Sequence, residues 1–280
     1  MLGQETVPRL QSFEDHRVLI FHDAYNAEWQ LRLPEVVAAR EGTFLSSPRT
    51  PMSWKNYPDG SRGYDWQTNE EYARTAYEQI RKRVPMILGM EISPRMQVRS
   101  NRVDLTLTLK NISDRTFHDV TADGGCLQHR ADRFFDDDHN RTYIKTEGGV
   151  MPLDHAHRSL AIRSKYFFNP AWYQDPATRA YEDFWGTSRT RPKAPWIVSK
   201  AVTGLGAIGI AWQHCFALRQ SSDAAHRCMH SSPYFGDLPP GGSLTRRGVI
   251  LFGDTIEDVI NGLEKERFSM YANPPQNIEN

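Results

Sequence analysis

The sequence predicts a mainly β protein, an antiparallel β-sandwich with a few short helices. Residues 103–109 alternate strictly between apolar and polar side chains, and many short apolar runs follow one another without regularly intervening helices. An alternation with period two places one face of a strand against a core and the other toward solvent. Strands that do not alternate regularly with helices favour an antiparallel sandwich over a βαβ architecture.

The expected strands can be placed in order along the chain. The first two cover 17–22 and 29–33, and the next two cover 87–98 and 98–111, joined by a turn at Ser100 and Asn101. Proline inside the third run, at position 94, predicts a bend or an edge position because it cannot donate to a ladder. The later strands, with a Pro-Pro-Gly-Gly turn before the last of them, are expected at 159–168, 196–202, 207–218, 225–230 and 244–252.

Two helices are expected. Residues 69–83 carry acids in the first turn and bases in the last, which suits the helix dipole, and Pro85 ends the segment. The second helix covers 255–266, where Thr255 and Asp258 have the spacing of a capping box. Its apolar residues fall on one face, so we expect that face to pack against a sheet.

The chain of 280 residues has no internal repeat and no low-complexity segment, so we expect one domain over 1–280. Residues 169–195 differ from the rest, because prolines, arginines and aromatic side chains gather there without strand periodicity. We expect a long loop over the sheet, and ordered long loops often carry binding function.

Charge and hydropathy exclude several classes of protein. The 34 basic and 34 acidic residues give a formal net charge of zero, which argues against a nucleic-acid partner. No run approaches the roughly 18 apolar residues of a membrane span, so no membrane partner is expected. The first ten residues lack the features of a signal peptide, which predicts a cytoplasmic protein, or a periplasmic or secreted one if a signal peptide has been removed. The three cysteines are too few for a disulfide framework, and we expect buried or free thiols at Cys126, Cys215 and Cys228.

Two motifs fail on their context. Residues 204–209 read G-L-G-A-I-G, but the interval before Asp223 is too short for the helix and strand of a dinucleotide site. Asp136, Asp138 and Asn140 have the first spacings of a calcium loop, yet Arg141 replaces its required glycine. We expect a glycine turn and a solvated acidic loop. The patterns of serine hydrolases, P-loop NTPases, zincins and zinc ribbons do not occur.

Histidines provide the most specific chemical signal. His226, Cys228 and His230 stand two residues apart in an expected strand, so their side chains share a face. His155 and His157 have the same spacing, and either pair can supply two imidazoles at metal-ligand distance. No cofactor is identified, although a divalent metal can be accommodated at residues 226, 228 and 230. A pair of histidines needs a third ligand, which can come from Cys228, His214, His129 or an acidic residue. Histidines with an ordinary structural role remain the alternative.

Aromatic residues are frequent in segments without strand periodicity, among glycine, proline, aspartate and arginine. Aromatic faces stack on sugar rings while polar side chains bind the hydroxyls, so this composition favours a sugar pocket. The residues concerned are Trp54, Tyr57, Tyr64, Trp66, Trp172, Tyr173 and Trp185.

Two segments resemble known proteins. The run V-D-L-T-L-T-L-K-N-I-S-D at 103–114, followed by Gly-Cys-Leu-x-His within 124–129, resembles the middle of galactose mutarotase-like supersandwich proteins. The segment 228–252 is similar to the last strands of uncharacterised bacterial sandwich proteins of carbohydrate catabolism. The H-P-Y-F loop of true aldose mutarotases is absent, unless 230–235 is a displaced analogue. The resemblance implies a supersandwich fold and a carbohydrate substrate.

The resulting hypothesis is a carbohydrate-active enzyme, a lyase, epimerase or glycoside hydrolase, with histidine acid/base chemistry in a cleft on one sheet. A non-catalytic sugar-binding module and a cupin-like metal enzyme are the alternatives. The oligomeric state is not predicted. The candidate acid/base residues are His230 and His226, followed by His129 and His214. Arg227 would orient a carboxylate or hydroxyls, Trp212 would stack on the sugar, and the other candidate contacts are Tyr234, Trp172 and Trp185.

Overall fold

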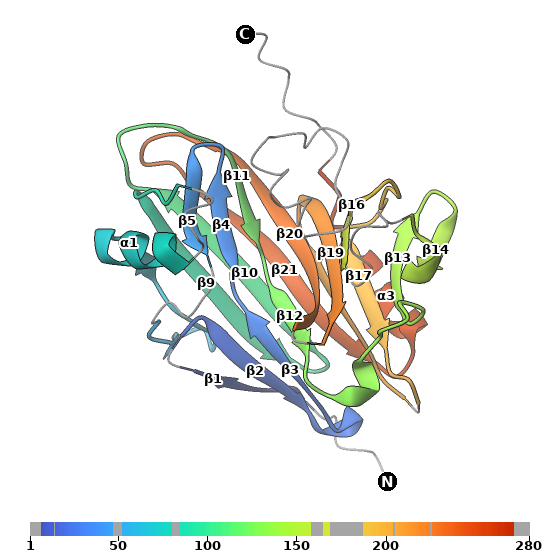
Figure 1. Cartoon of the computed structure of the whole chain (residues 1–280). Helices are drawn as coiled ribbons and strands as arrows, with labels where there is room; N and C mark the ends of the chain where they lie inside the picture. The colour runs from blue at the N-terminus through green and yellow to red at the C-terminus, as the bar shows by residue number, and fades with distance from the viewer. Residues whose placement is uncertain are drawn as a thin grey trace.

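Two large, mainly antiparallel β-sheets pack face to face in this protein (Figure 1). We describe a computed structural model, in which the chain is defined over 7–13, 15–46, 52–79, 85–157, 165–168, 187–203, 205–224 and 226–271. The expected mainly β sandwich is confirmed. Within these ranges, no helix is long and apolar enough to cross a membrane.

The larger sheet has 11 strands in the described ranges, and its main path runs β1-β2-β3-β12-β20-β11-β4-β5. Strands β15 and β16 extend it beyond β19, which pairs with β20. Its members are β1 (Arg9–Ser12), β2 (Arg17–His22), β3 (Ala27–Arg32), β4 (Val36–Ala39), β5 (Gly42–Ser46), β11 (Phe117–Asp123), β12 (Cys126–His129), β15 (Lys165–Phe168), β16 (Thr187–Ser188), β19 (Cys215–Asp223) and β20 (His226–Leu238).

The second sheet has 10 strands in the described ranges, in the order β14-β13-β17-β18-β21-β10-β9-β7-β6, with β8 paired to β9. Its members are β6 (Lys55–Asn56), β7 (Arg62–Gly63), β8 (Trp66–Gln67), β9 (Met90–Arg99), β10 (Arg102–Asn111), β13 (Thr142–Thr146), β14 (Gly149–Pro152), β17 (Trp196–Lys200), β18 (Ala207–Trp212) and β21 (Ser243–Gly253).

The core lies between the two sheets. The apolar residues of β10 at 103, 105, 107 and 109 are at most 1% exposed, as their alternation predicts. They face side chains of the larger sheet such as Trp29 and Leu31, which are fully buried. Burial of apolar surface between the two inner faces therefore stabilises the sandwich and fixes which face of each strand points inward.

Pro94 lies inside β9, where it pairs with Leu107 of β10. On the other side of β9, the short strands β7 and β8 pair at residues 95–96 and 91–92, so no ladder bond is required at Pro94. Proline has no N–H to donate to a neighbouring strand, and Pro94 lies in the gap between β7 and β8, where no such donor is needed. This position meets the requirement on which the predicted edge or bend was based.

Two α-helices fall in the described ranges, α1 (Glu70–Gln79) and α3 (Ile256–Lys265). Helix α3 packs on the outer face of β17, β18 and β21 through Val259 and Leu263 (Figure 1). Both helices begin within a residue of the predicted positions. Three short 3-10 helices cover Asp23–Tyr25, Asp132–Phe134 and Leu153–His155.

Removing the hydroxyl of Thr255 should destabilise the protein by about 1 kcal/mol. The Thr255 side chain accepts the N–H of Asp258 at 3.1 Å, and the Asp258 carboxylate accepts the N–H of Thr255, which completes the capping box. Urea unfolding of Thr255→Ala measures the loss. Thr75→Ala, on the exposed surface of α1, is the matched control and should cost much less. An equal loss in both variants would contradict the capping role.

Two expected strands differ in the structure. The run 207–218 is not one strand, because it turns at Gln213 and His214, where His214 adopts a positive φ of 52°. The strand expected to end at His230 continues to Leu238, so His230 lies in its middle. Only residues 165–168 of the strand expected at 159–168 and residues 187–195 of the aromatic loop are described.

Candidate functional site

The site forms on the face of the larger sheet that points away from the core. In β20, residues 226, 228, 230 and 232 share that face, while Met229 points into the core between the sheets. A face that points away from the core is ordinarily solvated, yet Cys228, His230 and Ser232 are completely buried here. As predicted, the side chains of His226, Cys228 and His230 therefore lie on one face of β20.

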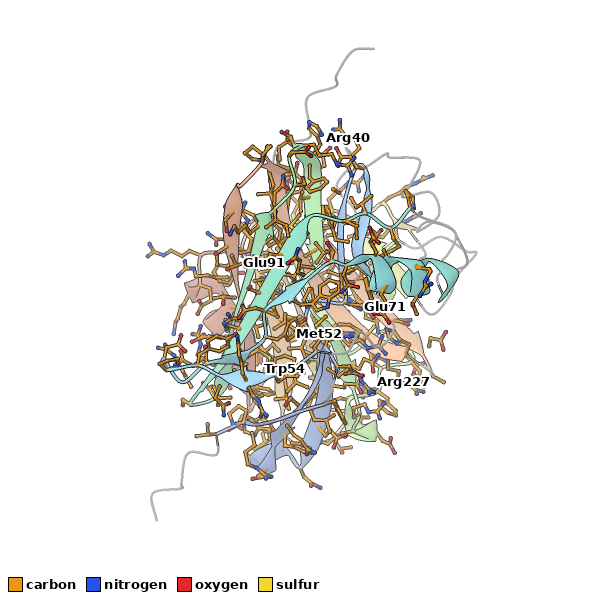
Figure 2. The ribbon with its side chains drawn as sticks, turned by 90° about the vertical axis from the view of Figure 1, so that its left-hand side faces the viewer. Arg40, Met52, Trp54, Glu71, Glu91 and Arg227 are labelled. Atoms are coloured by element: carbon orange, nitrogen blue, oxygen red, sulfur yellow. The ribbon has the colours of Figure 1, made fainter. Side chains whose placement is uncertain are left out.

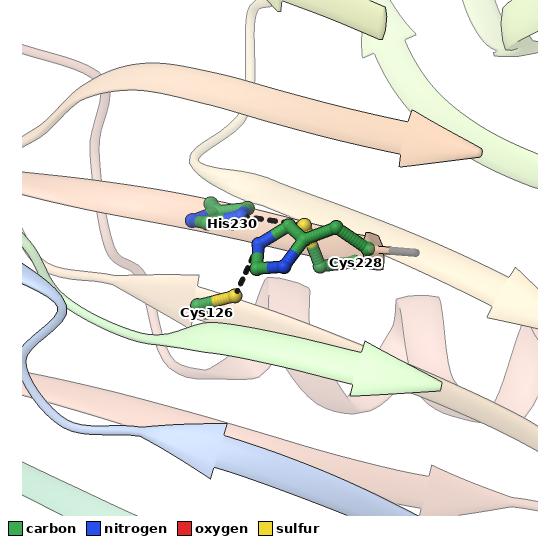
Figure 3. Close-up of side chains that lie close together, drawn as sticks. Cys126, Cys228 and His230 are labelled. Atoms are coloured by element: carbon green, nitrogen blue, oxygen red, sulfur yellow. Dashed lines mark hydrogen bonds between the residues drawn. The ribbon is translucent and has the colours of Figure 1, made fainter. Parts of the chain in front are cut away.

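Strand β12 adds a second cysteine to this face. It pairs with β20 so that Gln128 lies opposite Cys228, which places Cys126 beside His230. Sγ of Cys126 is 3.3 Å from Nε2 of His226, and Sγ of Cys228 is 2.9 Å from Nε2 of His230. Figure 3 shows Cys126, Cys228 and His230 converging. The two sulfur atoms and two imidazole nitrogens all lie within 4.8 Å of one another.

The buried ion pair of Asp123 and Arg219 contacts Nδ1 of His230. Nδ1 of His230 is 2.9 Å from Oδ1 of Asp123, at the end of β11, and the guanidinium of Arg219 donates to Oδ2 of Asp123 at 2.7 Å. Ser232 donates a third hydrogen bond to this carboxylate. Burial alone would raise the pKa of Asp123, but the positive Arg219 and His230 with these hydrogen bonds hold it well below the usual range.

The same carboxylate determines the state of the His230 ring. Burial works to lower the pKa of His230, but the charges and hydrogen bonds of Asp123 and Cys126 together outweigh it and raise that pKa well above 6.5. The Asp123 carboxylate can only accept, so Nδ1 of His230 carries a proton and Nε2 is directed at Cys228.

His226 is held at the outer end of the cluster. Its Nδ1 is 2.7 Å from the amide nitrogen of Gln128, and the side-chain oxygen of Gln128 accepts a hydrogen bond from Nε2 of Gln30. Oε1 of Glu35 lies 3.9 Å from Nε2 of His226, and the other Glu35 oxygen lies 3.8 Å from Nδ1 of His230. Glu35 is paired with Arg32 at 2.9 Å, so a carboxylate is fixed between the two histidines.

Both thiols of the cluster are fully buried, and burial raises the pKa of Cys126 and that of Cys228. Burial outweighs the neighbouring positive charges of His230 and Arg32, and a thiol whose pKa is raised is a poor nucleophile, because reactivity depends on the thiolate. The cluster therefore does not have the character of a cysteine-nucleophile site.

A small polar pocket opens beside the cluster, with a volume of about 110 Å³. His226 is the member of the cluster that borders it, and its side chain is 30% exposed whereas His230 is not exposed. The pocket is smaller than the roughly 300 Å³ of sites for drug-sized ligands. Its lining consists of Gln128, His129, Arg130, Phe135, Ala224, His226 and Arg227.

Of the four histidines predicted as acid/base residues, the structure brings His226 and His230 together. His129 borders the pocket, but its ring is almost buried on the opposite face of β12 and lies parallel to the ring of Phe134. His214 lies in the turn before β19, at the other end of that strand from the partner of His226. Neither ring belongs to the cluster, because alternation along β12 and the turn after β18 direct them elsewhere.

Of the predicted sugar contacts, Arg227 borders the pocket, whereas Tyr234 is buried elsewhere. Arg227 borders the pocket at the margin of the molecule, where it pairs with Asp137 and lies over the Phe135 ring (Figure 2). The Tyr234 hydroxyl donates to Asp119 at 2.6 Å, and the ring is 6% exposed.

Trp212 requires a correction. Its ring is fully buried in the core, and a Cβ on Gly248 would lie 2.5 Å from it, so glycine at 248 makes room for the indole. Stacking on a sugar therefore does not occur at this position. Trp172, Tyr173 and Trp185 lie outside the described residues.

Other expected features also change. Trp54 packs edge-to-face on the buried Tyr64, and Trp66 packs likewise on Tyr72, so these rings serve packing. His155 and His157 are not in a strand and are exposed, so they form no ligand pair. In the glycine motif, Gly204 lies outside the described residues. In the acidic loop, Asp136 is buried and accepts the N–H groups of Asn140 and Arg141.

The sequence argument missed Asp123, Glu35 and Arg219, and assigned Cys126 only a buried or free thiol. Cys126 lies inside the 124–129 segment that carried the resemblance, and Asp123 directly precedes that segment. Glu35 and Arg219 carry no local signal, since single charged residues in strand-rich segments are common.

The two packed sheets, together with the likeness to a solved galactose mutarotase-like protein, confirm the fold that the resemblance implied. Part of a solved α-N-acetylgalactosaminidase has a similar fold. The sequence itself matches no protein-family model, and no curated protein matches it.

Three solved structures illustrate the likeness. A protein of Synechocystis sp. PCC 6803 has 7% identity and a TM-score of 0.50, over 91% of this chain and 99% of that one. A galactose mutarotase-like protein of Lactobacillus casei has 8% identity and a TM-score of 0.51, over 90% and 98%. An α-N-acetylgalactosaminidase of Bifidobacterium bifidum in complex with GalNAc has 12% identity and a TM-score of 0.53, over 95% of this chain and 38% of that one. Identities this low establish a common fold.

Proposed function

We propose that this protein binds a single sugar unit in the pocket beside His226 and transfers a proton to or from it. The observation that carries the proposal is the position of His226, whose partly exposed ring borders a polar pocket while its nitrogens are held by Gln128 and Cys126. A positioned imidazole near neutral pH is the most common protein acid or base. His230, completely buried behind it, then acts as a positioning residue.

The pocket lining supports a sugar as the ligand. Arg130, Arg227 and the Gln128 amide supply donors for hydroxyls or a carboxylate, and Phe135 supplies apolar surface. The guanidinium of Arg130 favours an acidic sugar, because guanidinium binds carboxylates with two parallel hydrogen bonds, whereas Arg227 makes such a pair with Asp137. The volume of about 110 Å³ suits one edge of a monosaccharide unit better than an oligosaccharide.

Glu35 supports the proton transfer. Its carboxylate lies 3.9 Å from Nε2 of His226, close enough to stabilise the imidazolium that forms when the ring takes a proton from the sugar. Epimerisation, β-elimination from a uronic acid and glycoside hydrolysis all require such a step, and the substrate distinguishes them.

His226→Gln should lower turnover by about two to four orders of magnitude while the fold is retained. The test uses anomeric exchange of aldoses and uronic acids by NMR, unsaturated-product formation from uronic-acid oligosaccharides, and hydrolysis of neutral oligosaccharides. His155→Gln, whose side chain is 69% exposed and distant in sequence from the pocket residues, is the matched control and should keep full activity.

Two results would overturn the proposal. Full activity of His226→Gln on the best substrate would remove this residue from the chemistry. Sugar binding by the wild-type protein without turnover of any substrate in the panel would instead support a non-catalytic sugar-binding module.

A further inference from the structure

We propose that Cys126, His226, Cys228 and His230 form a Zn²⁺ site. This inference does not rest on the proposed function, since it follows from the donor set and its geometry alone. Two thiols and two imidazoles are the ligands of closed tetrahedral zinc centres. Soft sulfur donors combined with imidazole also disfavour Mg²⁺ and Ca²⁺, which prefer oxygen.

The distances suit a metal of this size. Metal–ligand bonds of about 2.0 to 2.3 Å imply about 3.3 to 3.8 Å between neighbouring ligand atoms in a tetrahedron. The separations here are 3.3 Å between Cys126 Sγ and His226 Nε2 and 2.9 Å between Cys228 Sγ and His230 Nε2, and all four atoms lie within 4.8 Å. Small side-chain rotations are therefore sufficient to form the tetrahedron.

The strands hold the donors in place before any metal binds. Three ligands stand at every second position of β20, and the fourth comes from β12, which is hydrogen-bonded to β20. Cys126, Cys228 and His230 are completely buried on a sheet face that points away from the main core. Each of these donors already contacts another member of the cluster, and His230 also contacts Asp123, so the donors face a common point.

The outer contacts of the two imidazoles provide a second, independent argument. Each ring directs Nε2 toward the sulfur atoms and engages Nδ1 with a fixed polar group, Asp123 for His230 and Gln128 for His226. Metal-bound histidines almost always donate their second N–H to a carboxylate, a carbonyl or water, which fixes the tautomer. The amides of Gln30 and Gln128 can turn over together, so that the Gln128 oxygen accepts from Nδ1 of His226.

The charges also balance. Zn²⁺ replaces the protons of both thiols and any proton on Nε2 of either imidazole, and two thiolates with two neutral imidazoles leave the centre neutral. Arg219 remains paired with Asp123 at 2.7 Å, so the outer ion pair persists. His226 is the one ligand with an exposed edge, which identifies the route by which the ion enters from the pocket.

Metal analysis of the purified full chain tests the site. Chelator-treated protein should take up one Zn²⁺ per chain, and Co²⁺ in its place should give thiolate charge-transfer absorption with the visible bands of a tetrahedral ion. Cys126→Ser and Cys228→Ser should each abolish this binding and the charge-transfer change. Cys215→Ser, which alters the remaining buried cysteine outside the cluster, should bind as the wild type does.

One further variant keeps the test decisive if a buried cysteine cannot be replaced without unfolding. His226→Gln changes the most exposed ligand, and because changes in outer-shell groups already cost about 10–100-fold in affinity, it should weaken zinc binding at least tenfold. No stoichiometric Zn²⁺ uptake by the wild type, or equal uptake in the Cys126→Ser, Cys228→Ser and Cys215→Ser variants, would overturn the inference.

The zinc site and the proposed sugar chemistry can fail separately. Bound zinc occupies Nε2 of His226, the atom that would carry the proton, so zinc should inhibit turnover and a chelator should restore it. Activation by zinc together with stoichiometric binding would retain the metal site and remove His226 as the acid/base residue.

Discussion

Asp123→Asn should destabilise the protein by about 3–5 kcal/mol, because it leaves a guanidinium buried without its counter-charge. The side chains of Asp123 and Arg219 are 2% and 8% exposed and their charged atoms are 2.7 Å apart. The substitution keeps the size of the side chain, so the effect reports the charge and its hydrogen bonds. Urea unfolding at neutral pH measures the loss.

The matched control is Asp23→Asn. Asp23 forms an ion pair with Arg9 over the same 2.7 Å, but the two side chains are 63% and 66% exposed. Solvent screens such a pair, so this variant should lose less than about 1 kcal/mol. Similar losses of stability in the two variants would contradict the prediction that burial strengthens the effect of losing the Asp123–Arg219 pair.

Acidification from pH 6.5 to 4 should destabilise the protein by about 3 kcal/mol for each of two buried histidines. Burial lowers the pKa of His16 to about 4 and that of His129 to about 4. Both ring nitrogens of His16, and Nδ1 of His129, have no hydrogen-bond partner among the described residues. Burial outweighs the attraction of Asp15 and Glu35 for a protonated His16, and Arg141 further disfavours a protonated His129.

The direction follows from proton binding. Between pH 6.5 and 4 the unfolded chain binds protons at His16 and His129 that the folded protein does not, so the free energy of unfolding falls as the pH falls. Above pH 6.5 the rings are neutral in both states and contribute no slope. The low pKa of Asp123 matters only below its usual value of 3.8, and the raised pKa of His230 has its effect above pH 6.5.

Urea unfolding at several pH values between 7.5 and 4 measures this slope, and NMR titration of the histidine rings assigns it. The double variant His16→Gln, His129→Gln should lose most of the slope. His155→Gln, on an exposed residue, should retain all of it. A wild-type protein with the same stability at pH 7 and pH 4.5 would contradict the prediction.

The strand and helix predictions succeeded where the signal was local. Alternation at 103–109 fixes the buried face of β10, and the Thr255–Asp258 spacing fixes the start of α3. They failed at His214, where a residue with positive φ splits one apolar run into two strands, and at His230, where the strand continues through Ser231, Ser232 and Pro233. Those residues are typical of turns, but pairing with β19 keeps them extended.

The candidate site was predictable only in part for the same reason. The spacing of His226, Cys228 and His230 is a local property, and any strand places such residues on one face. Trp212 shows the limit of composition, because an aromatic residue near histidines and arginines signals a sugar site or a core equally well. Its full burial against Gly248 depends on how β18 and β21 pair.

By itself, the sequence determined the fold class, the faces of its most regular strands and three of the four donors of the cluster. Only the tertiary structure decided that Cys126 joins donors located about 100 residues further along the chain, and that Asp123 and Glu35 meet them there. The physical reason is that strand order in a sheet is set by burial of whole faces against a second sheet. No local pattern records which strand becomes the neighbour of β20, or whether its outer face is covered.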